Sequence, residues 1–71
     1  MNLGEFVKQE RLDLALTQEE FGQKVRLTGV TISKIENGGK AGSKILKNLA
    51  KYFNISTREL RKMNNEPSEK N

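Results

Sequence analysis

The chain has 71 residues, a formal net charge of +4 and 34% hydrophobic residues, which is enough for one small core. It contains no cysteine and no histidine, which excludes disulfides and thiolate metal sites and removes the commonest general base. No apolar run approaches a membrane span and no signal-peptide pattern is visible, so we expect a cytoplasmic domain without metal or cofactor whose charge mildly favours a polyanion.

The first predicted helix begins after Asn2 and ends near Leu14. Asn2 is a good N-cap residue, and Glu5 three positions later completes a capping box. Phe6 and Val7 supply apolar contacts on a narrow buried stripe. The end of this helix is set by Thr17, which is needed to begin the next one.

Thr17 to Gly38 reads TQEEFGQKVRLTGVTISKIENG and predicts two short helices joined by a tight turn. Thr17 and Glu20 form a second capping box, and Thr28 is an N-cap candidate for the following helix. Apolar residues at helical spacing mark the inner side of both helices, namely Phe21, Val25, Ile32 and Ile35. Since only two residues separate Val25 from Thr28, the helices should cross steeply, as in a helix-turn-helix.

A glycine-rich stretch then predicts a loop, and the amphipathic segment from Ser43 to Phe53 predicts a fourth helix, capped by Ser43 or Gly42. Asn54 suits the left-handed position after that helix. Ser56 caps a last short helix, with Glu59 as its capping-box partner and Leu60 pointing inward. We therefore expect a folded domain over residues 1–63 and a disordered polar tail over residues 64–71.

The segments LTQEEFGQKV and LTGVTISKIENG resemble the helix-turn-helix of lambda-repressor-like, Cro-type bacterial and phage regulators. The resemblance covers about Leu3 to Leu60 and implies a compact five-helix, all-α domain. Arg26 departs from the pattern, because it stands where the family usually has a glycine and where the turn can require a positive φ. Gly29 also departs from it, because it stands where the family usually has a longer polar residue.

The resemblance implies that the helix from about Thr28 to Asn37 enters the major groove of double-stranded DNA. Val30 can meet a thymine methyl and Lys34 a guanine, while Gly29 lets the helix approach the groove floor closely. Gln18 is expected to contact a phosphate and to support the recognition helix. The full set of expected DNA-binding residues is Gln18, Thr28, Gly29, Val30, Thr31, Lys34, Asn37, Lys40, Ser43 and Lys44.

Two further sites follow from the resemblance and the pattern. Arg11 and Glu36 match family positions that form an ion pair between the first helix and the recognition helix; the alternative is that both are exposed and contribute little. A single recognition helix covers few base pairs, so we expect a homodimer. Its interface is expected at Met63, with Phe53 and Ile55 on the other side of the same patch.

These features predict a regulator of transcription that binds operator DNA sequence-specifically. We expect it to act as a repressor. An enzyme is disfavoured, because no carboxylate pairs with a histidine, a cysteine or a nucleophile constellation. The alternative is a protein-interaction module of the same fold, such as an antitoxin that holds a protein partner. Gly29, and the absence of arginine or glutamine from the recognition helix, support that alternative. Binding to mixed duplex DNA at low and moderate salt separates the two.

Overall fold

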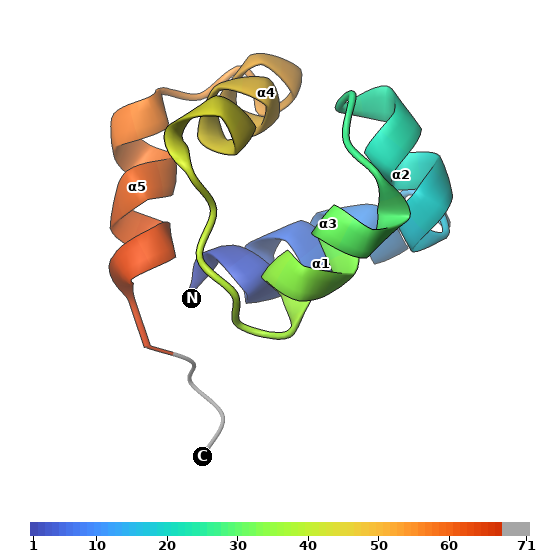
Figure 1. The fold of residues 1–71 in the computed structure, drawn as a ribbon, viewed down its shortest axis with the longest axis horizontal. Helices are drawn as coiled ribbons and strands as arrows, with labels where there is room; N and C mark the ends of the chain where they lie inside the picture. The colour runs from blue at the N-terminus through green and yellow to red at the C-terminus, as the bar shows by residue number, and fades with distance from the viewer. Residues whose placement is uncertain (68–71) are drawn as a thin grey trace.

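The computed structural model describes residues 1–67, which form five α-helices and no strand, as the sequence predicts. Figure 1 shows α3 lying in front of α1 beside α2, with α4 above them and α5 along the opposite edge. Contacts between helices join α3 to α1 and α2, and join α5 to α4 and α1. The bounds are Leu3–Asp13 for α1, Gln18–Lys24 for α2, Gly29–Glu36 for α3, Ser43–Phe53 for α4 and Thr57–Asn65 for α5.

Of the three predicted capping boxes, those at Asn2 and Thr17 are present and fix where α1 and α2 begin, whereas at Ser56 only the hydrogen bond from the Glu59 N–H forms. Asn2 Oδ1 accepts from the Glu5 N–H at 2.9 Å, and Glu5 Oε1 accepts from the Asn2 N–H at 2.9 Å. Thr17 and Glu20 form the same reciprocal pair at 3.0 and 2.9 Å. Each box satisfies two backbone N–H groups that have no partner inside the helix.

The later helices begin with simpler caps. Thr28 Oγ1 accepts from the Thr31 N–H at 3.1 Å, and Ser56 Oγ accepts from the Glu59 N–H at 3.2 Å. The cap of α4 is Gly42, which offers no side-chain oxygen, so Ser43 is the first residue of the helix and not its cap. The first N–H groups of α4 therefore receive no side-chain cap.

The turn between α2 and α3 is held in a strained form. Arg26 has a φ of 60°, the left-handed region in which glycine is favoured over other residues. The Leu27 N–H then donates to the Gly22 carbonyl at 2.7 Å. A Cβ on Gly22 would fall 2.6 Å from the Leu27 carbonyl oxygen, so only glycine permits this closure. The positive φ that this turn was expected to require is therefore present, and Arg26 adopts it.

The core lies where α3 meets the other helices. One side of α3 is buried through Ile32 and Ile35, and α2 contributes Phe21. The Phe21 ring stacks on Phe53 of α4 with centroids 5.9 Å apart. The largest fully buried side chains are Phe21, Ile32, Ile35, Leu49, Leu60 and Val7. Because this side of α3 is completely buried, α3 cannot turn about its axis, and its opposite side always faces outward. In residues 1–67 no helix has the length and apolarity to cross a membrane.

The last helix, α5, continues through Asn65, two residues past the boundary expected after Met63. The Asn64 side chain accepts from the Ala41 N–H and donates to the Ala41 carbonyl, both at 2.9 Å. The prediction of a tail from residue 64 rested on the lack of an apolar anchor, whereas the anchor here is a polar amide. The part of the predicted tail from 68 to 71 lies outside the described residues.

Candidate nucleic-acid interface

The exposed side of α3 carries an unusual apolar residue beside a lysine. Val30 is 70% exposed, the most open of the large hydrophobic side chains in residues 1–67. Lys34 follows one helical turn later and is also exposed. Both lie opposite the buried Ile32 and Ile35, so α3 presents a short ridge with one methyl-bearing and one cationic side chain.

The two threonines at the start of α3 are bonded to each other. Thr28 Oγ1 donates to Thr31 Oγ1 at 3.1 Å and also accepts from the Thr31 N–H. Thr28 is exposed, and Thr31 is half-buried. The hydroxyl of Thr28 therefore serves mainly the helix cap, while the O–H of Thr31 is left to donate to a phosphate oxygen or to an acceptor on a base edge.

Gly29 does not simply face outward, as the sequence suggested. A Cβ built on Gly29 would lie 3.1 Å from Cα and 3.2 Å from N of Glu19, at the start of α2. Such contacts are closer than ordinary van der Waals distances, so any side chain would begin against α2. The glycine thus permits close approach of α2 and α3, which is a packing role that the sequence analysis missed.

The predicted ion pair between α1 and α3 is present and largely buried. Arg11 Nε donates to Glu36 Oε2 at 2.7 Å, and Arg11 Nη2 donates to Glu36 Oε1 at 3.0 Å. Only 11% of the Arg11 side chain and 4% of the Glu36 side chain are exposed. Arg11 Nη1 also donates to the Leu16 carbonyl at 2.9 Å, so one guanidinium ties together α1, α3 and the segment before α2.

These contacts also set the charge state of the arginine. The hydrogen bonds to Glu36 raise the pKa of Arg11 above its ordinary value, and the nearby carboxylate charge acts in the same direction against desolvation. A raised pKa means that this contribution to stability is complete below the unfolded-state pKa of arginine. It is lost only as the pH rises through the folded-state value, so the guanidinium stays charged in the neutral range.

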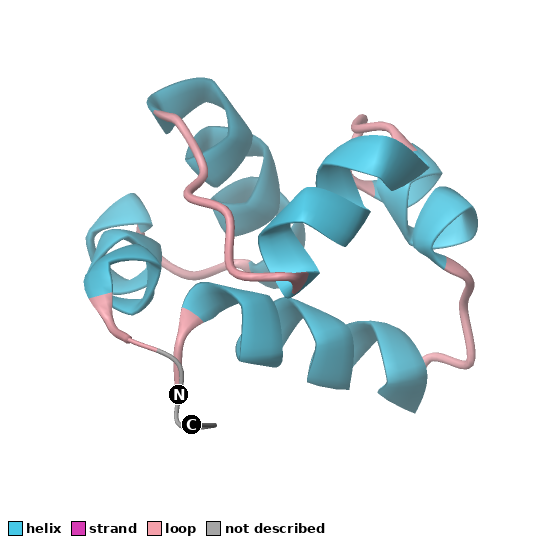
Figure 2. Ribbon diagram, turned by 60° about the horizontal axis from the view of Figure 1, so that its bottom comes forward, coloured by secondary structure: helices cyan, strands magenta, loops and turns pink. Residues whose placement is uncertain are grey.

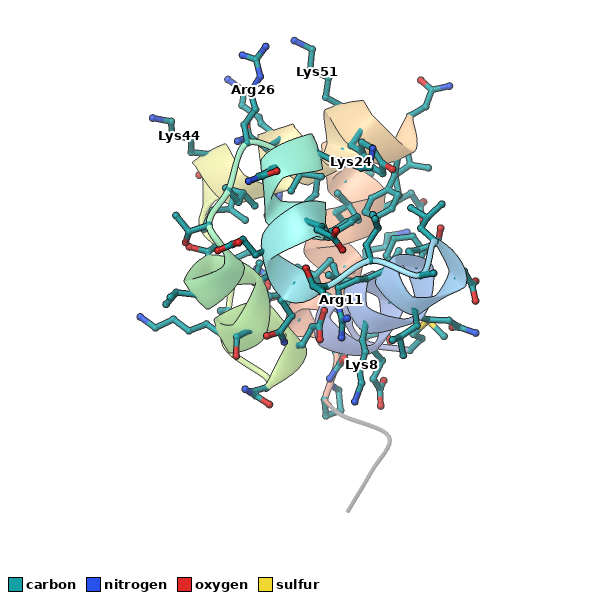
Figure 3. All side chains as sticks on the ribbon, turned by 90° about the vertical axis from the view of Figure 1, so that its right-hand side faces the viewer. Lys8, Arg11, Lys24, Arg26, Lys44 and Lys51 are labelled. Atoms are coloured by element: carbon teal, nitrogen blue, oxygen red, sulfur yellow. The ribbon has the colours of Figure 1, made fainter. Side chains whose placement is uncertain are left out.

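Gln18 joins the same cluster from the first turn of α2. Its Nε2 donates to Glu36 Oε1 at 3.2 Å, and its side chain is half-buried. The predicted support of the recognition helix is therefore visible as a hydrogen bond. Figure 3 places Arg11 in the middle of the molecule, between the helices that it joins.

The residues that follow α3 lie along the loop of residues 37–42 and the start of α4. Asn37 Nδ2 donates to Ser33 Oγ at 3.3 Å, and Lys40 Nζ donates to Asn65 Oδ1 at 3.3 Å. Ser43 and Lys44 are exposed at the start of α4 and line an open groove between α4 and α5. Figure 3 shows Lys44 projecting away from the body of the molecule. Lys40 is thus engaged with α5, and Lys44 is the more open cation.

The three residues expected at a dimer interface pack partly on the core. Phe53 meets Phe6 edge-on with centroids 5.0 Å apart, and Ile55 and Met63 are half-buried against the same core. Each side chain keeps some exposed surface. Their contribution to an interface remains a prediction.

Two short helices, α2 and α3, pack on each other across a tight turn, and α3 is fixed on its inner side and open on its outer side. This arrangement defines a helix-turn-helix DNA-binding regulator. Comparison with known families agrees: a helix-turn-helix family model matches residues 7–60, more than half of the 71-residue chain. The chain belongs to the lambda-repressor and Cro-like helix-turn-helix family. The comparison with curated proteins found no match.

Two positioning residues escaped the sequence analysis. A Cβ on Gly4 would collide with the Ile35 carbonyl oxygen, so this glycine lets α1 lie directly against the end of α3. Its place inside a helix, where glycine is disfavoured, was the available signal. Asn64 holds the loop before α4. Nothing in the local pattern around Asn64 distinguished it from the other polar residues nearby.

Proposed function

We propose that the chain binds operator DNA sequence-specifically in the cytoplasm and represses transcription, with α3 in the major groove. One observation carries this proposal. The inner side of α3 is fixed by Ile32, Ile35 and the Arg11–Glu36 pair, while Val30 and Lys34 stand exposed on the outer side. A helix held in this way presents the same few side chains to each groove that it enters.

The chemistry of the exposed residues suits base edges. Lys34 can donate to guanine O6 and N7, and Val30 can pack on the methyl group of thymine. Thr31 can reach either a base edge or a phosphate. Because Gly29 offers no side chain to a base, discrimination by each half-site should be modest.

Phosphate contacts are assigned to the flanks of α3. Lys44 is exposed beside the first N–H groups of α4, which have no side-chain cap. An ammonium group next to free helix N–H groups attracts a phosphate oxygen. The proposed backbone contacts are completed by Gln18, Asn37, Lys40 and Ser43. Gln18, Asn37 and Lys40 each donate one hydrogen bond within the protein and keep at least one further N–H for a phosphate oxygen.

The working form is proposed to be a symmetric homodimer on a palindromic site. Two recognition helices about 34–36 Å apart would read two half-sites, which one domain of this size cannot do. Met63, near the end of α5, is the preferred interface residue because methionine adapts to irregular contacts. Phe53 and Ile55 would line the same patch.

In-vitro selection from a random duplex pool tests the proposed function. The expected result is an enriched, inverted repeat that the protein binds at least a hundredfold more tightly than mixed duplex at moderate salt. Lys8→Ala removes one exposed charge on α1, outside the proposed contacts, and should select the same repeat as wild type. Binding that is weak, sequence-blind and abolished by moderate salt would favour a protein-interaction module instead.

Sedimentation tests the dimer. Wild type on the selected palindrome should form a complex with two protomers, and Met63→Glu should bind as one protomer or with a large loss of affinity. Leu12→Glu is the control, because Leu12 is an exposed hydrophobic residue at the far end of α1. A complex with one wild-type protomer would refute the dimer, and normal dimers of Met63→Glu would move its interface elsewhere.

A further inference from the structure

The last turn of α5 reaches back to the loop between α3 and α4. The Asn64 side chain makes hydrogen bonds to both backbone groups of Ala41. The Ala41 N–H donates to Asn64 Oδ1, and the Ala41 carbonyl accepts from Asn64 Nδ2, each at 2.9 Å. Ala41 is buried, and Asn64 is half-buried. We call this pair of hydrogen bonds the amide clamp. It satisfies a buried loop residue that has no helix partner of its own.

The clamp acts on the half of the loop that leads into α4. The first half is tied to α3, because the Gly38 N–H donates to the Ile35 carbonyl at 3.1 Å and the Gly39 N–H donates to the Lys34 carbonyl at 2.8 Å. The second half is tied to α5 by Asn64, with Lys40 and Asn65 adding one exposed hydrogen bond. Figure 2 shows this loop running from α3 to the start of α4.

Lys44 follows Ala41 by three residues and stands beside the uncapped start of α4. Whatever holds Ala41 therefore helps to hold the start of α4, from which these N–H groups and the Lys44 side chain project. The family match ends at Leu60, four residues before Asn64. The clamp is thus supplied by a part of the chain outside the matched residues.

We propose that Asn64 is a positioning residue for DNA binding: its amide holds the loop so that Lys44 and the start of α4 meet the DNA backbone. This inference rests on the proposed function. Asn64 itself need not touch DNA. Loss of the clamp would leave the loop to be ordered at the moment of binding, which lowers affinity without changing the base preference.

The test compares Asn64→Ala with Gln9→Ala on the selected duplex. Gln9 is a matched control, because it also loses a side-chain amide but lies exposed on α1, outside the loop and the proposed DNA contacts. Asn64→Ala should bind about five- to thirtyfold more weakly with the same selected motif, while Gln9→Ala should stay within about twofold. Asn64→Gln keeps both the acceptor and the donor on a longer side chain, so an intermediate loss is expected.

A double-mutant cycle with Lys44→Ala separates positioning from general destabilisation. If Asn64 acts through Lys44 and its neighbours, the effect of Asn64→Ala should shrink to less than half in the Lys44→Ala background. Amide exchange at Ala41 in the free protein, well below the melting temperature, should be faster in Asn64→Ala. If Asn64→Ala folds poorly, the same cycle is run with Asn64→Gln.

The outcomes are distinct. If wild type binds the selected duplex and Asn64→Ala binds it equally well, the positioning role is overturned and the proposed function stands. The same conclusion follows if the losses in the double-mutant cycle are strictly additive. Absence of specific binding by wild type would overturn both. Unchanged exchange at Ala41 would show that the clamp does not order the loop.

Discussion

The recognition helix α3 and the loop that follows it are held by two different kinds of contact. Glu36 at the end of α3 is held by charge, in a nearly buried pair with Arg11 that also involves Gln18. Ala41 in the loop is held by a neutral amide from Asn64 at a half-buried position. Breaking a buried charged contact leaves a charge without a partner, whereas breaking a neutral one leaves only a dipole. The two segments should therefore fail in different ways.

The largest expected effect comes from Glu36→Ala, which removes the charged contact. Arg11 would be left buried without its carboxylate, so the free energy of unfolding should fall by about 3–5 kcal/mol. A domain of this size has about 4–10 kcal/mol in total. Thermal unfolding should shift down by roughly 12 °C or more. Glu19→Ala, at an exposed position, should change stability by less than about 1 kcal/mol.

Replacing both residues of the Arg11–Glu36 pair tests whether the loss of stability comes from an unpaired buried charge. Arg11→Met combined with Glu36→Met removes the charges together and fills the space with apolar groups. The double variant should be more stable than Glu36→Ala alone, because no charge is left buried. A double variant that is as unstable as the single one would show that packing, and not charge, dominates this site.

Lys34→Ala tests the readout by α3. It should cost about 1–3 kcal/mol on the best site and relax the preference at one position, since one donor to a base is lost. Lys24→Ala, at the end of α2, is a matched loss of one positive charge. If both variants weaken binding equally on every sequence, Lys34 contributes charge only.

Lys44→Ala tests the phosphate contact beside the loop. Binding should weaken by a similar factor on all sequences, and the slope of log affinity against log salt should fall by roughly one unit. Measuring affinity at four salt concentrations gives that slope. A loss that depends on base sequence would contradict the assignment.

Arg26→Gly should give the smallest effect and has the opposite sign. Glycine removes the cost of a positive φ at this turn, partly offset by its greater freedom in the unfolded chain, so stability should rise by up to about 1 kcal/mol. Lys47→Gly, inside α4, should instead destabilise by about 1 kcal/mol. Chemical unfolding of the two variants checks these opposite signs. A loss of stability in Arg26→Gly would mean that the arginine side chain makes up for its strain.

The contrast also explains what could be predicted from the sequence. Caps, apolar spacing and the turn are local signals, so Asn2, Thr17 and Thr28 were assigned correctly. The Arg11–Glu36 pair spans 25 residues and was expected only through the resemblance to a known family. Asn64 also acts on a residue far away in the chain, but nothing in its neighbourhood marks it. The same limit applies to Gly29, whose close neighbour Glu19 belongs to another helix.

The measurement that tests the account most directly is in-vitro selection with three proteins side by side: wild type, Lys34→Ala and Lys44→Ala. The account predicts that wild type selects an inverted repeat and that Lys34→Ala loses preference at one position of each half-site. It predicts that Lys44→Ala selects the wild-type motif with lower affinity. An unchanged motif in Lys34→Ala, or an altered motif in Lys44→Ala, would contradict the assignment of base readout to α3 and of phosphate contact to the start of α4.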